Sequence, residues 1–267
     1  MHGDPPPEPA PDSSYVFAGA GEAERARLDL LARLTDPLHR RALSQAGLRA
    51  GLRCLELGAG TGTVAAWLAG RTGPEGQVLA TDIDLSFLDG PARPPLEIRR
   101  VDAVKDELPP AAFDVVTASA LLHHLPQWES VVDRMAAALA PGGALVLVEP
   151  DVGAALLGRP EHRRFWADWC RWGRSQGIDY GLGRKLPDAV RRAGLDVQDV
   201  TMEVPFYDEG SPWDTLYRAT LQAIRPRLAG WDGPDLVAAY DRLPTGPGRP
   251  ACGLGWTAVV GRAPGTP

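Results

Sequence analysis

Short apolar runs alternate with helical patterns along the first two thirds of the chain. Each run is short and is bounded by glycine, proline or polar residues, which predicts a strand. The five expected strands are 52–57, 77–81, 96–101, 113–119 and 144–149. Because helical patterns separate these strands, the order of elements predicts a parallel sheet with helices on both faces.

Apolar residues that recur every three or four positions predict the helices. The expected helices are 21–34, 37–46, 63–70, 131–139, 160–176, 211–228 and 235–243. One more helix is expected to open at Gly183 and to end at the segment AGLDV, and strands 197–204 and 255–261 are expected to close the sheet. The whole pattern predicts a seven-stranded, mostly parallel α/β sheet with N-terminal helices and with helical insertions after strands 5 and 6.

The first strand ends in Cys54-Leu-Glu-Leu-Gly-Ala-Gly-Thr-Gly62, where an acid precedes three glycines at alternate positions. Glycine permits positive φ and a close approach of the backbone to a ligand, so Gly58, Gly60 and Gly62 predict a binding loop. The helix after the loop directs its free N–H groups at the same ligand. A dinucleotide fingerprint, G-x-G-x-x-G, has its third glycine one residue later, so the spacing disfavours that class of cofactor.

This segment resembles motif I of the class I S-adenosylmethionine (SAM) methyltransferases, (E/D)-x-G-x-G-x-G. The stretches GLRAGLRCLELGAGTG and LAPGGALVLVEPD resemble, more narrowly, bacterial small-molecule (natural-product) methyltransferases. The resemblance implies a Rossmann-like fold, SAM as cofactor and S-adenosylhomocysteine as product. It assigns the methionine end of the cofactor to the motif residues Glu56, Gly58, Ala59, Gly60 and Gly62.

The resemblance places further cofactor contacts at the ends of the next two strands. An acid about 20 residues past a glycine loop suits ribose hydroxyls, and Asp82 holds that position; the alternative is an acid that only caps a loop. In the family the next residue, matched by Ile83, packs on the adenine ring. Asp102 and Ala103 match residues that meet the adenine amino group, although Asp102 equally suits a solvated loop.

Two more residues complete the expected cofactor contacts. Tyr15, in the N-terminal lid, is expected either to hydrogen-bond the methionine carboxylate or to pack the leader onto the core. Ser119 ends the fourth strand, at the edge of the sheet where ligands of open α/β folds bind. Asp84 is expected only to cap the short helix that follows it.

Adjacent histidines, His123 and His124, follow the fourth strand in the segment LLHHLP. Histidine titrates near neutral pH and can accept a proton. The segment resembles the LHDWP of natural-product O-methyltransferases, whose first histidine is the general base, so His123 is the candidate base and His124 the second. The alternative is packing or a cofactor contact. Glu149 and Asp151, beyond the fifth strand, are expected to cap their loop or, failing that, to act on the acceptor.

The helix at 160–176 carries Trp166, Trp169 and Trp172 at intervals of three. This spacing places them along one stripe of the helix, where they would form an aromatic wall for a flat acceptor or part of the core. Trp213, in the later insertion, allows the same two interpretations, as do its neighbours Tyr217 and Trp231. The acceptor contacts are therefore expected at Trp166, Trp169 and Trp213.

Composition narrows the class of partner. A net charge of −6, with scattered basic residues, argues against a nucleic-acid partner. The three cysteines (54, 170 and 252) lack paired or metal-ligand spacing, which predicts a reducing, cytoplasmic location and no metal. No apolar run is long enough to span a bilayer, so no membrane partner is expected. A homodimer is allowed.

The length of 267 residues suits one domain. We expect a disordered, proline-rich leader at 1–14 and a single SAM-dependent methyltransferase domain at 15–262. Within the domain, the expected parts are a helical lid at 15–47, a SAM-binding core at 48–150, and acceptor-side helices and closing strands at 151–262.

The expected function is SAM-dependent methyl transfer to a small organic acceptor, foremost the O-methylation of a secondary metabolite. Methyl transfer needs alignment of donor and acceptor more than a fixed set of catalytic groups, so the sequence does not name the acceptor. The alternatives are N- or C-methylation of a small molecule, a cyclisation or rearrangement without net methyl transfer, and a non-catalytic SAM-binding module.

Overall fold

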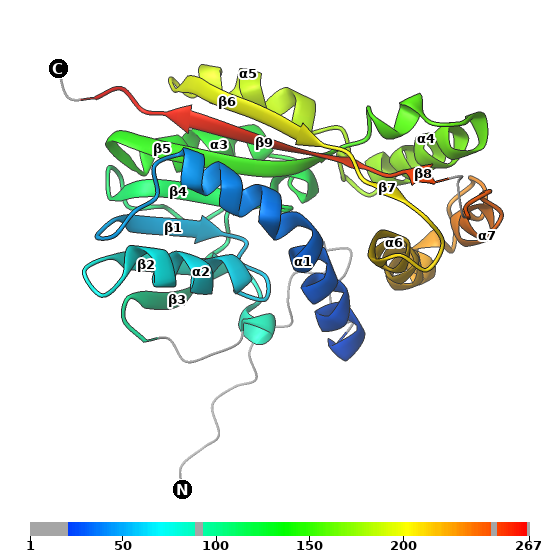
Figure 1. The fold of residues 1–267 in the computed structure, drawn as a ribbon, viewed down its shortest axis with the longest axis horizontal. Helices are drawn as coiled ribbons and strands as arrows, with labels where there is room; N and C mark the ends of the chain where they lie inside the picture. Colours follow the sequence, from blue (N-terminus) through cyan, green and yellow to red (C-terminus); the bar gives the residue numbers. More distant parts are fainter. Residues whose placement is uncertain (1–20, 89–92, 247–249, 266–267) are drawn as a thin grey trace, which may run out of the picture.

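The computed structural model describes residues 21–88, 93–246 and 250–265 (Figure 1). Its main sheet has seven strands in the order β3-β2-β1-β4-β5-β9-β6. Their bounds are β1 Arg53–Leu57, β2 Gln77–Asp82, β3 Leu96–Arg100, β4 Phe113–Ser119, β5 Leu139–Asp151, β6 Asp196–Glu203 and β9 Gly255–Arg262. Strands β1 to β5 are mutually parallel, and β9 is antiparallel to β5 and β6. The predicted seven-stranded, mostly parallel, Rossmann-like sheet is confirmed.

The described part of the chain forms seven α-helices. Their bounds are α1 Gly21–Gln45, α2 Thr63–Thr72, α3 Trp128–Ala137, α4 Pro160–Ser175, α5 Leu186–Arg192, α6 Pro212–Ile224 and α7 Leu236–Asp241. Short 3-10 helices are η1 Leu85–Phe87, η2 Leu122–His124, η3 Ala155–Leu157, η4 Gly183–Lys185 and η5 Arg225–Leu228. One core layer joins α1 and α2 to the sheet, and another joins α3 and α5 to the opposite face.

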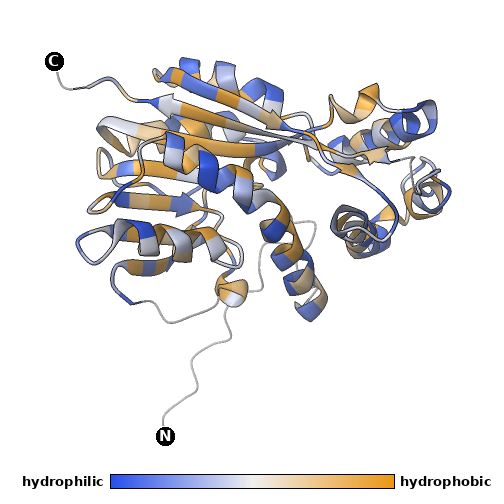
Figure 2. Cartoon of the chain, in the orientation of Figure 1, coloured by the Kyte–Doolittle hydropathy of each residue, from blue (hydrophilic) through white to orange (hydrophobic). Residues whose placement is uncertain are grey.

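The central strands are nearly continuous apolar runs, as Figure 2 shows. Helices cover both faces of a parallel sheet, so its inner strands need apolar side chains on both sides. Every residue of β5 from Gly143 to Asp151 is buried, whereas the edge strands β3 and β6 alternate between exposed and half-buried positions.

Strand register decides which side chains share a face of the sheet. Glu56 lies beside Thr117 of β4, and Thr117 lies beside Val146 of β5. Paired residues point to the same face and successive residues to opposite faces, so Glu149 points away from the face of Glu56. Glu56 therefore faces the α1 and α2 layer, and Glu149 faces the α3 and α5 layer.

The two N-terminal helices expected from the sequence form one helix. The prediction broke the segment before Pro37, but α1 continues through it. Proline lacks an N–H and clashes with the preceding turn, which costs about 3 kcal/mol in a helix interior. Leu38, Ala42 and Leu43 are buried against the sheet beyond this point, and their packing outweighs the local penalty.

A smaller aromatic cluster forms at one end of the molecule, where α4, α6 and α7 gather at the right of Figure 1. A two-stranded sheet of β7 (Phe206–Tyr207) and β8 (Ala251–Cys252) joins these helices. We call this part the cap. The sequence did not predict β7 and β8, because two residues are too few to show the alternation that identifies a strand.

Candidate functional site

The glycine loop leaves β1 in a conformation that requires glycine. Gly58, Gly60 and Gly62 have φ of 70°, 56° and 78°. A Cβ on Gly58 would lie 3.0 Å from the side chain of Leu121, and one on Gly62 would lie 2.9 Å from Leu88. The loop therefore packs directly against the segment that follows β4, and larger residues would push the two apart.

Asp82 ties the end of β2 to this loop. Its Oδ2 accepts the Gly60 N–H at 2.9 Å, and its Oδ1 accepts the Asp84 N–H at 3.1 Å. The loop residue Ala59 also donates its N–H to Thr81 O at 2.9 Å. Each carboxylate oxygen has a second lone pair, so Asp82 keeps the capacity to accept hydroxyl groups of a ligand. Asp84 caps η1 by accepting the Ser86 N–H, as expected.

Glu56 is buried under the loop with an incomplete set of partners. Its Oε2 has no hydrogen-bond partner among the described residues. Burial raises the pKa of Glu56 well above its usual value, and the nearby charges of Asp36 and Asp82 raise it further. A buried acceptor with a spare oxygen and acidic neighbours favours a positively charged group above the loop.

The other expected cofactor residues lie along the same edge of the sheet. Ser119 and Ile83 are half-buried where their strands end. Asp102 follows β3, but its Oδ1 accepts the Val104 N–H at 2.9 Å and its Oδ2 lies 3.1 Å from Lys105 Nζ. Both carboxylate oxygens of Asp102 thus contact neighbouring residues of its own loop.

Two further points concern the expected cofactor contacts. The carbonyl of Ala103 accepts a hydrogen bond from Arg134. Tyr15 lies outside the described residues, so its expected contact with the methionine carboxylate stays a prediction.

Beyond β4 the chain turns sharply into η2. Ala120 has φ of 54°, a left-handed conformation that non-glycine residues rarely adopt. The buried carboxyl of Glu149 then receives the turn: Oε1 accepts the N–H groups of Leu121 at 3.0 Å and Leu122 at 2.7 Å. Such strain concentrates at functional sites and persists where surrounding bonds hold it. Glu149 therefore caps the loop, as the sequence favoured.

Glu149 orients the candidate base. Its Oε2 lies 2.7 Å from Nδ1 of His123, a buried side chain. Burial lowers the pKa of His123 to about 3 and raises that of Glu149 to about 8. Backbone N–H groups that point at the carboxyl lower the pKa of Glu149 and so favour its ionised form. His123 is therefore uncharged near neutral pH, and one of its two ring nitrogens is committed to Glu149.

The loop after α4 holds this histidine from the other side. Asp179 donates its N–H to the carbonyl of His123 at 2.8 Å, and the ring of Tyr180 lies 5.7 Å from the His123 ring. The ring of His124 lies 3.9 Å from that of His123, so both histidines sit in one cluster. Sequence reasoning missed Tyr180 because it follows α4 in a glycine-containing loop with no periodic pattern.

The tryptophans expected to form an acceptor wall occupy different surroundings. Trp166 is fully buried and donates its indole N–H to Cys252 O at 3.0 Å, which joins α4 to β8 in the cap core. Trp169 is buried against Tyr180, with 5.6 Å between the ring centroids. Trp213 is half-buried and stacks on Tyr217 at 5.9 Å. Trp169 thus lies nearest in contact to the histidine cluster.

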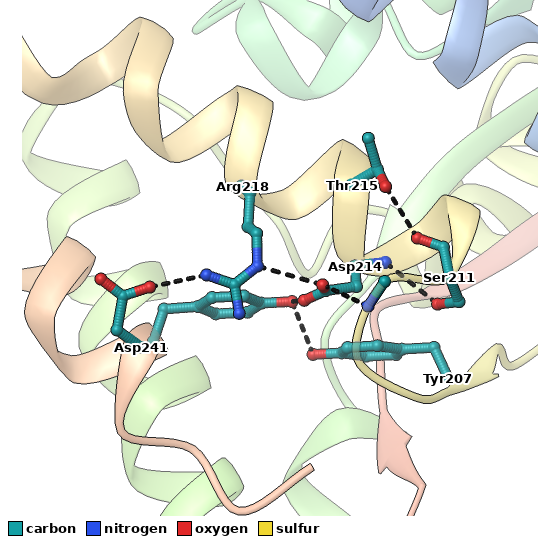
Figure 3. A network of polar contacts seen from close by, with 8 residues as sticks. Tyr207, Ser211, Asp214, Thr215, Arg218 and Asp241 are labelled. Carbon is teal, nitrogen blue, oxygen red and sulfur yellow. Dashed lines mark hydrogen bonds and ion pairs between the residues drawn. The ribbon is translucent and has the colours of Figure 1, made fainter. Parts of the chain in front are cut away.

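A polar network holds the cap together (Figure 3). The buried Oδ1 of Asp214 accepts the hydroxyl of Tyr240 at 2.9 Å, and that hydroxyl lies 3.2 Å from the hydroxyl of Tyr207. Oδ2 of Asp214 accepts a hydrogen bond from Arg218 Nε at 3.0 Å. Arg218 also donates from Nη1 to Oδ1 of Asp241 at 2.6 Å. These contacts link α6, α7 and β7.

Residues 24–200 match a family model described as a methyltransferase domain. The chain belongs to this methyltransferase family. An uncharacterized methyltransferase of Mycobacterium bovis is 35% identical over 116 residues, 42% of this chain and 57% of that protein. UbiE of Ralstonia pickettii, a ubiquinone/menaquinone biosynthesis C-methyltransferase, is 28% identical over 182 residues, 58% of this chain and 71% of that protein. The match thus spans little more than half the length of the mycobacterial relative.

Solved structures share the fold. A Haemonchus contortus phosphoethanolamine N-methyltransferase in complex with S-adenosylhomocysteine has a TM-score of 0.59 at 16% identity, covering 95% of this chain and 60% of that chain. The [4+2]-cyclase SpnF has a TM-score of 0.56 at 18% identity, covering 86% and 82%. At such identities the likeness concerns the fold, because one fold supports many chemistries.

The residues at the glycine loop fit SAM, the cofactor of this family. SAM carries an ammonium, a sulfonium and ribose hydroxyls, and Glu56 and Asp82 offer acceptors of matching character. A Cβ on Gly60 would meet no atom within 4 Å, so the space above the loop is open. The loop would hold the methionine end and Asp82 the ribose. When bound, SAM supplies an electrophilic methyl group.

Two further observations concern membrane-spanning helices and metal sites. In the described part of the chain, no helix is both long and apolar enough to cross a membrane. No group of three or more histidine, cysteine, aspartate or glutamate side chains among the described residues could hold a metal ion.

Proposed function

We propose that the protein transfers the methyl group of SAM to a hydroxyl of a small organic molecule, foremost in the O-methylation of a secondary metabolite. One observation carries the proposal: a buried, uncharged histidine, His123, is oriented by Glu149 at the carboxyl end of β4. Ligands of open α/β sheets bind beyond this end of the strands. A hydroxyl must lose its proton when it is methylated, and this histidine can take it.

His123 would use both of its ring nitrogens, Nδ1 toward Glu149 and Nε2 toward the acceptor. Once Glu149 is ionised, above its pKa of about 8, His123 carries its proton on Nδ1 and donates it to Glu149 Oε2, while Oε1 accepts the N–H groups of Leu121 and Leu122. The Nε2 lone pair then faces the acceptor and takes its proton as the acceptor oxygen gains the methyl group. The held tautomer removes the need to reorient the ring during the reaction.

The cap supports an apolar, flat acceptor. The ring of Trp169 contacts the ring of Tyr180, and the ring of Tyr180 contacts that of His123. Aromatic side chains of this kind commonly line small-molecule sites, where they also exclude water. Trp213 belongs to the same proposal as a more distant part of the wall.

C-methylation of a hydroxylated ring is the second candidate. The relative from Ralstonia pickettii is described as a C-methyltransferase of ubiquinone and menaquinone biosynthesis. A ring carbon becomes nucleophilic when its neighbouring hydroxyl is ionised, so His123 would serve this reaction as well. The two differ in whether the new methyl group in the product resides on oxygen or on carbon.

The deciding experiment measures S-adenosylhomocysteine and product together, for purified protein given SAM and a panel of phenols. One S-adenosylhomocysteine per methylated product is expected, and carbon NMR of the product separates an O-methyl from a C-methyl group. Product formed without consumption of SAM would move the protein to the cyclisation or rearrangement class. SAM binding with no product from any acceptor would indicate a non-catalytic module.

Other expectations stay predictions. They are the division of the chain at 15–47, 48–150 and 151–262, the cytoplasmic location, and the homodimer. Gel filtration with light scattering tests the last of these directly.

A further inference from the structure

Three tryptophans of α4 share the same burial but differ in hydrogen bonding. Trp166, Trp169 and Trp172 are each at most 1% exposed. The indole N–H of Trp166 donates to Cys252 O, whereas those of Trp169 and Trp172 have no acceptor among the described residues. A buried donor without an acceptor costs stability, so each of the two needs an explanation.

Contacts separate Trp169 from Trp172. The Trp169 ring lies 5.6 Å from that of Tyr180, which lies 5.7 Å from the ring of His123. No aromatic contact joins Trp172 to this chain of rings in the part of the molecule that the structure describes. Of these two tryptophans, only Trp169 therefore presents its buried, unpartnered N–H within two ring contacts of the candidate base.

The surroundings limit what could satisfy this N–H. Phe165 and Trp166 pack on Trp169 at 5.7 and 5.6 Å, and neither offers an acceptor to it. An indole N–H is a donor only, so the missing partner must accept a hydrogen bond. A carbonyl oxygen does so without bringing a donor of its own into apolar surroundings.

We propose that the acceptor is an aromatic hydroxy compound with a carbonyl group, which lies along Tyr180 with its hydroxyl at His123 Nε2 and its carbonyl oxygen at Trp169 Nε1. This inference rests on the proposed function and deepens it by naming the substrate class. Two polar contacts, one at each end of the acceptor, would orient its ring, which methyl transfer to one particular oxygen requires.

The test compares two phenols of nearly the same shape, 4-hydroxyacetophenone and 4-ethylphenol, with SAM at saturation. Release of S-adenosylhomocysteine gives KM and kcat. For wild type, KM is expected to be about tenfold lower for 4-hydroxyacetophenone, the effect of one hydrogen bond to a buried donor. Trp169→Phe keeps an aromatic ring but removes the N–H, so the two KM values should become equal while kcat changes less.

Trp172→Phe is the matched control, because it deletes an equally buried, unpartnered N–H from the same helix. It should keep the tenfold preference. Equal KM values for wild type, or a preference that survives in Trp169→Phe, would overturn the inference but leave methyl transfer standing. A preference lost equally in Trp172→Phe would also overturn it, since packing would then be the cause. Methylation of neither phenol by wild type would count against the proposed function.

A second measurement covers the case in which Trp169→Phe does not fold. Nitrogen-15 labelling of tryptophan in the wild-type protein gives one indole N–H signal per tryptophan, and a new hydrogen bond moves the signal of its donor downfield. One indole signal is expected to shift with 4-hydroxyacetophenone and to stay in place with 4-ethylphenol. The same signal should remain in Trp172→Phe. An unchanged set of indole signals at saturating 4-hydroxyacetophenone would overturn the inference.

Discussion

Nδ1 of His123 lies 2.7 Å from Oε2 of Glu149, although 26 positions separate the two residues in the chain. The bond joins the turn after β4 to the end of β5, and it leaves Nε2 as the nitrogen available for chemistry. The proposed reaction depends on this orientation, so both residues give direct tests.

Removal of the base should abolish most turnover but spare the cofactor site. His123→Ala is expected to lower kcat by about 10²–10⁴-fold, the usual contribution of a general base. SAM affinity, measured by calorimetry, should stay within about twofold, a difference of less than 0.5 kcal/mol. Glu149→Gln should also lower kcat, because its amide can donate to Nδ1 and so favour the wrong tautomer. His124→Ala serves as the neighbouring control, and an equal loss of kcat in it would contradict the assignment of His123.

Asp82 is expected to contribute to SAM affinity through its carboxylate. Asp82→Asn keeps the size but places an amide N–H₂ where an oxygen now accepts a backbone N–H, so affinity should fall about tenfold or more. Asp84→Asn is the control, because Asp84 only caps η1 and asparagine caps equally well. Calorimetry with SAM compares the two variants, and equal affinities would show that Asp82 does not touch the cofactor.

Proton release should accompany SAM binding. Burial, aided by the charges of Asp36 and Asp82, raises the pKa of Glu56 well above its usual value, so the free protein keeps a proton there to a higher pH than an exposed glutamate does. A bound cation favours the ionised form, and the proton leaves. Affinity should therefore rise with pH until Glu56 is ionised in the free protein as well. Calorimetry in phosphate and in Tris detects the proton, and Glu56→Gln should remove the difference between the two buffers.

The buried histidines should make the fold sensitive to acid. Burial lowers the pKa of His39 to about 3 from 6.5. Between these values the unfolded chain binds a proton that the folded chain does not, so stability falls as pH decreases. One such group contributes about tenfold in the unfolding constant per pH unit. His39→Gln, which can keep the bond to Thr117, should lessen the slope in urea unfolding from pH 6 to pH 4.5. An identical slope would refute the assignment.

The cap should depend on Asp214 for stability. Asp214→Asn leaves a buried N–H₂ facing the donors Gly210 N–H and Arg218, which is expected to cost about 1–3 kcal/mol in the free energy of unfolding. Asp241→Asn is the control. Asp241 is an exposed partner of Arg218, so its loss should cost at most about 1 kcal/mol. Urea unfolding measures both, and similar values for the two would show that the network of Figure 3 contributes little.

The sequence predicted the parts of the site that are local in the chain. Gly58, Gly60 and Gly62 lie within five positions and have the positive φ that their spacing suggested. Asp82 ends its strand, and its bond to the loop is a consequence of two parallel strands ending at one edge. Such features need only the pattern of strands and the chemistry of a few residue types.

Sequence reasoning did not reach contacts that depend on packing. Their spacing gave Trp166 and Trp169 the same predicted role. In the structure, the indole N–H of Trp166 donates to the carbonyl of Cys252, whereas the ring of Trp169 lies against Tyr180. Nothing in the loop after α4 marked Tyr180. The continuation of α1 through Pro37 has the same origin, because burial of the helix against the sheet is a tertiary effect.

The two buried acids of the site face opposite layers of one sheet, Glu56 toward α1 and α2 and Glu149 toward α3 and α5. In the proposed function, donor recognition by Glu56 and acceptor activation through Glu149 thus depend on opposite layers of the sheet. Directed evolution toward new acceptors should begin with Tyr180 and Trp169 and leave β1 and α2 unchanged. Substitutions at Tyr180 and Trp169 are expected to have little effect on SAM binding.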